Sequence, residues 1–216
     1  MIEKFRGVYL IEDKLATKNL VAGRKVYGEK FVREGGAEYR LWNPNRSKLA
    51  AAIFNGLGEL PLNENSKVLY LGAASGTTAS HISDIVSQGL VFCVDFSPRV
   101  FVKLLEVCEL RKNMIPIFAD ASQPGQYSSI VEKCDVIYQD IAQPNQVEIL
   151  AANAEHYLKL GGSVIIAIKA RSIDVSKEPR KIFDAEIEKL KKFFKILDVV
   201  YLEPYEKDHV LVVGES

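Results

Sequence analysis

The pattern of hydrophobic and polar positions divides the chain at about residue 45. Before this point, short apolar and β-branched runs alternate with turn-forming dipeptides such as Lys18-Asn19 and Ala22-Gly23. Such runs indicate strands joined by tight turns. We therefore predict a small antiparallel β domain over residues 1–45, with its strands in the runs 8–11, 20–21, 27–32 and 39–42.

The segment after this domain has a helical period. Asn43-Pro44-Asn45 interrupts the chain, and Leu49, Ile53 and Leu57 then recur at the spacing of one helix face. We predict an alanine-rich helix over residues 46–57 that begins at the Asn-Pro-Asn interruption.

From residue 67 onward, strand and helix patterns alternate. The apolar runs are short and lack the alternation of half-exposed strands, which is typical of strands buried on both faces of a parallel sheet. The predicted strands cover 68–71, 90–94, 115–118, 136–138 and 164–168, the helices 78–86, 98–110, 147–158 and 179–194, and a closing antiparallel pair 196–202 and 209–213. This order predicts a wound, Rossmann-like α/β domain over residues 46–216. On the last helix we predict an ion pair between Glu188 and Lys192.

The first strand of this domain leads into a turn of small residues. The segment GAASGTT contains Gly72, Ala73, Gly76, Thr77 and Thr78. A strand followed by a glycine-rich turn and a helix is the place where open α/β sheets bind nucleotide-like cofactors. The spacing is G-x-x-x-G rather than G-x-G-x-x-G, so it serves a pyrophosphate poorly. The threonine hydroxyls suit a ligand with an amino-acid end, which favours S-adenosylmethionine over a nicotinamide dinucleotide.

Acidic residues follow three of the predicted strands. Asp95 lies 23 positions after Gly72, close to the offset of an acid that binds ribose hydroxyls. Asp120 is placed to meet an adenine amino group, and Phe96 to cover the base. An ordinary solvated strand end explains one such acid almost as well, but the successive acids at one sheet edge favour a cofactor site.

A second polar group combines amines with a carboxylate. Lys169 ends an apolar strand, and Asp140 ends a neighbouring one. A desolvated lysine can act as a general base toward a hydroxyl group, with the carboxylate orienting it. Lys48 and His209 are expected to complete the cluster, although lysines at strand ends are more often solvated or paired.

The overall composition excludes several classes of protein. The 28 basic and 28 acidic residues balance, which argues against an autonomous nucleic-acid binder. The three cysteines predict buried, reduced thiols and a cytoplasmic location. No metal-ligand spacing is present, and no apolar run approaches the roughly 18 residues of a membrane helix.

Several ordered segments resemble the fibrillarin family. They are YRLWNPNRSKLAAAI, KVLYLGAASGTTASHISDIV, DVIYQDIAQPNQ, IAIKARSID and LEPYEKDHVLVVG. The resemblance covers nearly the whole chain. The Gly/Arg-rich N-terminal tail of eukaryotic members is missing, so the chain is similar to the shorter archaeal form. It implies a class I S-adenosylmethionine-dependent methyltransferase fold with a mostly parallel seven-stranded sheet.

The resemblance also implies the reaction, the partners and the residues. The reaction is methyl transfer to ribose 2′-hydroxyls of rRNA and tRNA during their processing, at sites chosen by a C/D-box guide RNA. The implied partners are this guide RNA, a Nop-type scaffold protein and a kink-turn-binding ribosomal-type protein. The implied catalytic tetrad is Lys48, Asp140, Lys169 and His209. Cofactor binding is expected from Gly72, Ala73, Gly76, Thr77, Thr78, Asp95, Phe96, Asp120, Ala121, Asp140, Ile141, Ala142 and Gln143.

Two other functions fit the same fold. One is a stand-alone class I methyltransferase that modifies a protein side chain such as glutamine. The other is a non-catalytic assembly subunit that retains the cofactor fold.

Overall fold

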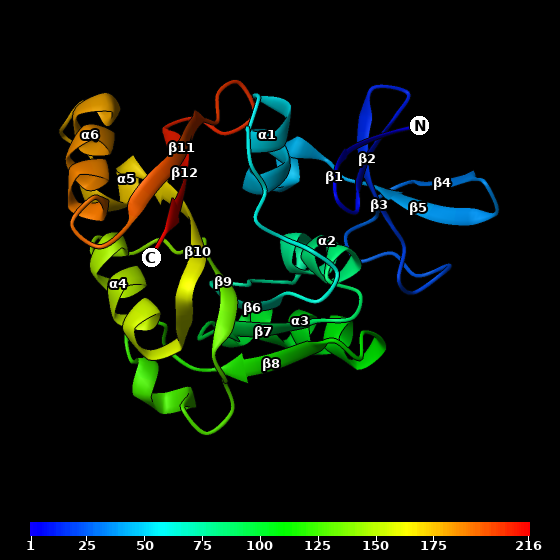
Figure 1. Cartoon of the computed structure of the whole chain (residues 1–216), viewed down its shortest axis with the longest axis horizontal. Coiled ribbons are helices and arrows are strands. Elements are labelled where there is room, and N and C mark those ends of the chain that lie inside the picture. The colour runs from blue at the N-terminus through cyan, green and yellow to red at the C-terminus, as the bar shows by residue number, and fades with distance from the viewer.

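The computed structural model describes all 216 residues, which form two sheets and their helices (Figure 1). The strands are β1 (Ile2–Phe5), β2 (Val8–Ile11), β3 (Lys14–Lys18), β4 (Phe31–Glu34), β5 (Ala37–Leu41), β6 (Lys67–Leu71), β7 (Leu90–Asp95), β8 (Met114–Phe118), β9 (Cys134–Gln139), β10 (Leu158–Lys169), β11 (Lys195–Tyr201) and β12 (His209–Glu215). The helices are η1 (Pro44–Arg46), α1 (Lys48–Phe54), α2 (Thr77–Ile85), α3 (Pro98–Leu110), η2 (Pro124–Tyr127), α4 (Gln146–Tyr157), α5 (Ala170–Ile173) and α6 (Pro179–Leu190). None of these helices combines the length and the apolar character needed to span a bilayer.

The larger sheet has seven strands in the order β11-β12-β10-β9-β6-β7-β8. Strands β8, β7, β6, β9 and β10 pair in parallel, and β12 is antiparallel to both β10 and β11. The predicted mostly parallel sheet with a closing antiparallel pair is therefore confirmed. The chain leaves β6 in one direction to β7 and β8 and later returns to β9 on its other side, so the strand order reverses between β6 and β9. Open α/β sheets bind their ligands at this kind of reversal.

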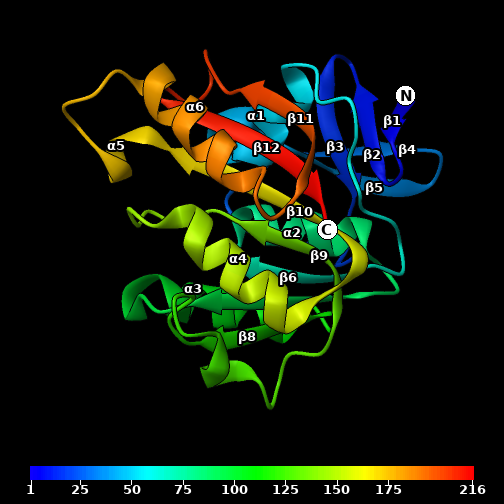
Figure 2. The same cartoon turned by 60° about the vertical axis from the view of Figure 1, so that its left-hand side comes forward.

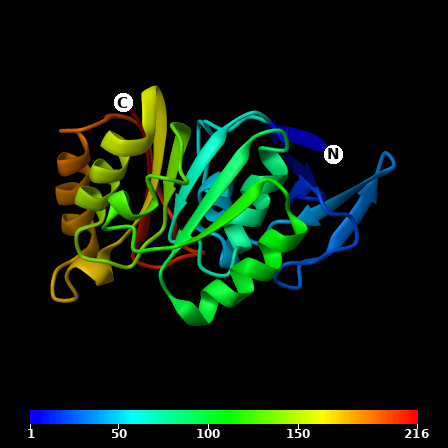
Figure 3. The same cartoon turned by 90° about the horizontal axis from the view of Figure 1, so that it is seen from below.

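Alternate residues of the parallel strands enter two separate cores. In β6, Val68 and Tyr70 pack against α1, α2 and α3, whereas Leu69 and Leu71 pack against α4 and α6. Figure 2 shows α4 and α6 together on the near face of the sheet, and Figure 3 shows the sheet from below. Burial of both faces explains why these strands lack a polar alternation in the sequence.

The N-terminal residues form a five-stranded antiparallel sheet in the order β1-β2-β3-β5-β4. The fold class is thus as predicted, but several strand assignments are wrong. Residues 20–21 lie in a loop, the strand predicted at 27–32 is β4 at Phe31–Glu34, and β1 and β3 were not predicted. Strand β3 was missed because its sequence, KLATK, contains few of the residues that favour strands.

The N-terminal sheet is joined to the larger sheet by buried charges. Arg40 on β5 donates to Glu29 at 2.6 Å and to Asp84 on α2 at 2.8 Å. Arg111 donates to the other oxygen of Asp84 at 2.7 Å, and Thr17 on β3 also donates to this carboxylate. All five side chains are buried, and the Arg40–Asp84 ion pair and the Thr17–Asp84 hydrogen bond cross the boundary between the N-terminal sheet and the larger domain.

Three predicted details of the helices and strands are wrong. The helix predicted at 46–57 spans only Lys48–Phe54, because η1 occupies the residues before it, Ser47 caps its start and Asn55 ends it. The last helix ends at Leu190, so Lys192 lies beyond it and Glu188 pairs instead with Lys191 at 2.6 Å. Strand β10 begins at residue 158 rather than 164, with an irregular register before Ser163.

Candidate active site

The turn after β6 requires its two glycines for different reasons. Gly72 has φ +82°, and a Cβ atom there would lie 2.3 Å from the carbonyl oxygen of Asp140. Gly76 has φ +85° and is the N-cap residue of α2, where no side chain caps the helix. Ala74 between them also has a positive φ, of 48°. The G-x-x-x-G spacing thus reflects a tight turn that brings β6 and β9 into contact.

A cavity of ≈ 210 Å³ lies at the carboxyl ends of β6, β7, β8 and β9. Eight of the expected cofactor residues line it: Gly72, Asp95, Phe96, Ala121, Asp140, Ile141, Ala142 and Gln143. Five further lining residues were not predicted: Ala74, Val94, Ser97, Val100 and Ala119. These are small or apolar residues that supply the wall of the cavity, and only Ala74 and Ser97, beside recognised motif residues, could have been found from the sequence.

The first acid of the cavity is held by backbone N–H groups. The Asp95 carboxylate accepts hydrogen bonds from the N–H groups of Ala74 and Ser97, both at 2.8 Å. These bonds fix the carboxylate at the end of β7, beside the exposed ring of Phe96. A carboxylate fixed in this way can accept two hydroxyl donors, as the vicinal hydroxyls of a ribose require.

Asp120 lies between two residues that line the cavity, Ala119 and Ala121, without lining it itself. The N–H of Ser122 donates to its carboxylate at 2.8 Å, and this bond lowers the pKa of Asp120. Asp120 is therefore ionised at neutral pH and can accept a hydrogen bond from an amino group at the rim.

The two threonines of the turn do not line the cavity, and neither do Ala73 and Gly76. The Thr78 hydroxyl is buried and donates to the hydroxyl of Ser47 at 2.9 Å. Ser47 in turn accepts from the N–H of Ala50 and so caps α1. In this structure Thr78 thus connects α2 to the start of α1. A serine that precedes an alanine-rich helix is the signal that could have identified Ser47 as the cap of α1.

The four tetrad residues come together at the same edge of the sheet. Lys48 is the first residue of α1, and its Nζ lies 2.9 Å from Oδ2 of Asp140. Lys169 and His209 are directly opposite each other in the β10–β12 register. Asp140 also lines the cavity, so the tetrad and the cavity share one residue.

The pairing within the tetrad differs from the prediction. We expected Asp140 to orient Lys169, but its carboxylate pairs with Lys48. The Lys169 ammonium makes no ion pair, whereas its backbone N–H and C=O both bond to the side chain of Gln146, at 3.1 and 3.2 Å. Gln146, which was not predicted as a site residue, therefore fixes the backbone at the end of β10 and not the Lys169 amine.

His209 is held as a neutral acceptor. Burial lowers the pKa of His209, and the nearby Lys48 lowers it further against the opposing effect of a hydrogen bond to the Lys207 carbonyl. This bond, 2.6 Å from Nδ1, requires the proton on Nδ1. Nε2 is then a buried acceptor that has no partner in the protein. His209 thus supplies a neutral hydrogen-bond acceptor beside Lys169.

Comparison with known proteins gives a match along the whole chain. The family model described as Fibrillarin matches residues 1–216. The chain is 56% identical over 220 residues to the "fibrillarin-like rRNA/tRNA 2′-O-methyltransferase" of Methanopyrus kandleri, with 99% of this chain and 95% of that protein covered.

Three solved structures are similar in fold as well as in sequence. A fibrillarin described as a pre-rRNA processing protein from Methanococcus jannaschii has a TM-score of 0.96 and 52% identity, with 99% and 96% of the two chains covered. Aeropyrum pernix fibrillarin with natively bound S-adenosyl-L-methionine has a TM-score of 0.91 and 48% identity, with the same coverage. A fibrillarin in complex with Nop5p has a TM-score of 0.91 and 50% identity, with 97% of each chain covered.

Proposed function

This chain belongs to the fibrillarin family, and we propose that it methylates the ribose 2′-hydroxyl of rRNA and tRNA with S-adenosylmethionine as the methyl donor. One observation carries this proposal: the cluster of Lys48, Asp140, Lys169 and His209 shares Asp140 with the cavity at the strand-order reversal. Methylation of a hydroxyl group needs a proton acceptor close to a cavity that holds the methyl donor, and this edge of the sheet supplies both.

The cavity fits S-adenosylmethionine in its chemistry. Asp95 is positioned for the ribose hydroxyls, Phe96 for one face of the adenine, and Asp120 for its exocyclic amino group. Gly72 leaves the backbone open where a side chain would strike Asp140. When bound, the cofactor supplies a methyl group already activated on a sulfonium sulfur.

The remaining work of the protein is to align the hydroxyl group and to remove its proton. We assign Lys169 as the base, because Asp140 pairs with Lys48 and leaves the Lys169 amine free to approach the hydroxyl group. The Lys48–Asp140 pair holds the edge of the cavity, and Nε2 of His209 accepts a hydrogen bond from the ribose. Alignment can contribute about 7–11 kcal/mol, whereas a general base contributes roughly 10²- to 10⁴-fold, so positioning dominates.

The partners follow from the same proposal. The solved complex of a fibrillarin with Nop5p supports a Nop-type scaffold for this chain as well. We propose that a C/D-box guide RNA selects the target and that a kink-turn-binding protein completes the particle. Delegation of sequence choice to a guide agrees with the net charge of zero. A cytoplasmic location stays a prediction.

Reconstitution with a radiolabelled methyl donor tests the function. The full chain is combined with the scaffold, the kink-turn-binding protein, a guide RNA and a target RNA. We expect label on a single ribose of the target, and none with a target whose 2′-hydroxyl at that position is replaced by hydrogen. Transfer of the label to a protein side chain instead would favour the stand-alone enzyme, and donor binding without turnover would favour the assembly subunit.

A further inference from the structure

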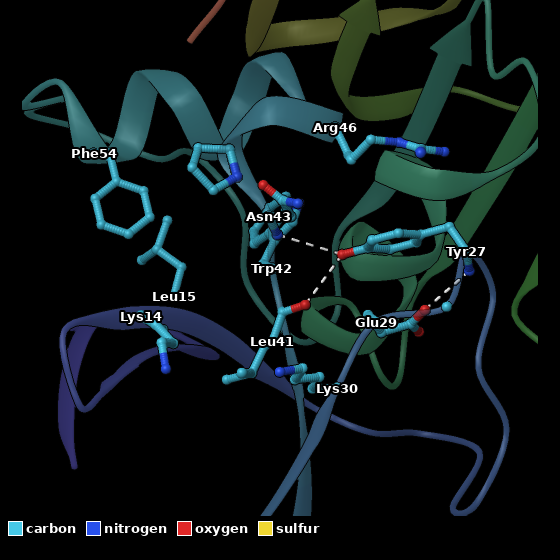
Figure 4. Close-up of a pocket in the computed structure, with 12 residues that line it drawn as sticks. Lys14, Leu15, Tyr27, Glu29, Lys30, Leu41, Trp42, Asn43, Arg46 and Phe54 are labelled. Carbon is cyan, nitrogen blue, oxygen red and sulfur yellow. Dashed lines mark hydrogen bonds between the residues drawn. The ribbon is translucent and has the colours of Figure 1, made fainter. Parts of the chain in front are cut away.

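The two lysines of the tetrad are held by different parts of the fold. Lys48 follows a segment that packs against the N-terminal sheet. In this segment the N–H of Asn43 donates to the Tyr27 hydroxyl at 3.4 Å, and the Arg46 guanidinium lies 5.9 Å from the centre of the Tyr27 ring (Figure 4). Lys169 lies instead at the end of β10, inside the larger sheet, and a side chain of α4 supports it.

The backbone of Lys169 extends beyond the strand that runs beside it. Strand β9 pairs with β10 only as far as Gln139, which lies opposite Ile166. After Gln139 the chain turns into the segment 140–143, which lines the cofactor cavity. Lys169 comes three residues after Ile166, so β9 provides no strand partner for it. Its backbone N–H and C=O therefore need other partners on this side.

Gln146 takes the place of the missing strand. Its Oε1 accepts from the Lys169 N–H at 3.1 Å, and its Nε2 donates to the Lys169 carbonyl at 3.2 Å. A side-chain amide carries the same donor and acceptor as a peptide group, so it satisfies both backbone groups. Gln146 is itself fully buried, and its carbonyl accepts from Nε2 of Gln139 at 2.7 Å. We call these bonds to Lys169 the Gln146 clamp.

The Gln146 clamp also affects how Lys169 meets His209. The two residues lie opposite each other in the β10–β12 register. Lys169 directs its N–H and C=O to the clamp, and the His209 carbonyl accepts from the N–H of Leu202 at 3.1 Å, so the pair shares no backbone hydrogen bond. Side chains in such antiparallel pairs lie closer together than in hydrogen-bonded pairs. The clamp thus holds Lys169 in the geometry that places its side chain beside that of His209.

One short segment serves both the donor and the base. Residues 140–143 line the cofactor cavity, and Gln146 follows as the first residue of α4. The segment 140–146 therefore sets the place of Lys169 relative to the cavity. This relation matters because the rate of a transfer between bound groups depends steeply on their separation and alignment.

We propose that Gln146 is a positioning residue for the methyl transfer, which holds the backbone of Lys169 in a fixed relation to His209 and to the cofactor cavity. The inference rests on the proposed function, since it takes Lys169 as the base. Gln146 does not line the cavity, so its effect passes through Lys169. Gln139 supports the clamp through the Gln146 carbonyl.

Gln146→Met tests this role by kinetics in the reconstituted particle. Methionine has a similar length but lacks both amide groups. We expect the rate of methyl transfer to fall about ten- to a hundredfold, since misplacement of reacting groups by about 1 Å can cost this much. Donor affinity and KM for the target RNA should stay within about twofold. Calorimetry counts the chains that bind donor, so the rate is expressed per intact cavity and loss of folded protein does not affect it.

The pH dependence of the same rate gives a second readout. The clamp bonds to the backbone of Lys169 and not to its amine. Gln146→Met should therefore lower the plateau of the pH profile and leave its midpoint in place. An unchanged rate per cavity would overturn the inference. A shifted midpoint would overturn it too, because Gln146 would then tune the amine rather than position it.

Two further variants separate positioning from general damage. Ile149→Val shortens a buried side chain on the same helix and should leave the rate per cavity within about twofold. Gln139→Met removes the bond to the Gln146 carbonyl but keeps the clamp, so the rate should fall several-fold, less than in Gln146→Met. If Gln146→Met does not fold, Gln139→Met decides the question, and an unchanged rate in it would contradict the inference. An equal fall in Ile149→Val would also do so.

Amide exchange measured by NMR tests the clamp without turnover. Gln146→Met should speed exchange of the Lys169 N–H about tenfold or more, because its acceptor is lost. The N–H of Leu211, in the centre of β12, is the internal control and should not change. Equal exchange at Lys169 in both proteins would show that Gln146 does not hold this backbone. If the unsubstituted protein methylates no RNA, the proposed function fails, whereas the exchange comparison still decides whether the clamp exists.

Discussion

The ammonium of Lys48 lies 2.9 Å from the carboxylate of Asp140, across the space between α1 and the end of β9. Both side chains are about one-fifth exposed, at 20% and 22%. Because this pair satisfies the carboxylate, Lys169 is left without an anionic partner at the same edge of the sheet. The two lysines of the tetrad are therefore not equivalent.

Replacement of Lys169 tests its assignment as the base. Lys169→Ala should lower kcat by about 10²- to 10⁴-fold, because the proton acceptor is lost. S-adenosylmethionine affinity should stay within a few-fold, since Lys169 does not line the cavity. Calorimetry and single-turnover methylation measure the two quantities, with Lys181→Ala as the control. A similar loss of affinity and turnover would show that Lys169 acts through cofactor binding instead.

Ser47 should position Lys48 through the start of α1. Ser47→Ala removes the helix cap and the acceptor for Thr78, so we expect a loss of about 1 kcal/mol in stability together with a lower kcat. Ser47→Thr keeps a hydroxyl and should restore most of both. Ile182→Val on α6 is the matched control, because its stability loss of about 1 kcal/mol lies on the far face of the sheet. If both variants lower kcat alike, the effect is global destabilisation.

Gly72 should be required for the cofactor cavity. Gly72→Ala places a methyl group 2.3 Å from the Asp140 carbonyl oxygen at a φ of +82°, so β6 and β9 must separate where they line the cavity. We expect donor affinity to fall at least tenfold by calorimetry. Gly125→Ala is the control, since nothing lies within 4 Å of its added Cβ. Unchanged affinity in Gly72→Ala would mean that the donor does not occupy this cavity.

Acid should destabilise the junction between the two sheets through His81. Burial holds the pKa of His81 well below the usual histidine value of about 6.5. The Thr17 hydroxyl donates a hydrogen bond to Asp84, so it can only accept the bond from Nδ1 of His81. The other ring nitrogen, Nε2, then accepts a hydrogen bond from the Tyr27 hydroxyl. The unfolded chain takes up a proton at this histidine below about pH 6.5 and the folded chain does not, so stability falls as the pH falls through that value.

Denaturant unfolding at pH 7.5 and pH 5.5 measures this effect. His81→Gln is less stable at both pH values, but it lacks the titrating group. The drop in stability on acidification should therefore be smaller in the variant, by up to about 1.4 kcal/mol per pH unit. An equal drop in both proteins would show that His81 does not cause the loss of stability at low pH.

The strands and helices that could be predicted from the sequence are those with a clear local pattern of apolar residues and end signals. β6, with the sequence KVLYL, is apolar on both faces, and α3 begins at Pro98 and ends at Leu110 as its pattern indicated. The turn with Gly72 and Gly76 could be located because glycines mark positions of positive φ. The same local signals placed Asp95 and Asp140 at strand ends.

Contacts between distant segments could not be predicted in the same way. Nothing local distinguishes a threonine that faces a ligand from Thr78, whose hydroxyl bonds to a serine 31 residues away. The choice of Asp140 between Lys48 and Lys169 depends on how α1 packs against the sheet. Likewise Arg40 and Asp84 are residue types that usually lie on the surface. Only the packing of β5 on α2 buries this pair.

The buried charges around Asp84 have a mechanical consequence. A hinge between the N-terminal sheet and the cofactor domain would separate the buried Arg40 from the Asp84 carboxylate, which is strongly unfavourable. The N-terminal sheet is thus rigidly attached to the cofactor domain. A partner that binds its outer β4–β5 hairpin also fixes the direction in which the tetrad faces, so a large particle can orient this enzyme toward one nucleotide without contacting the tetrad itself.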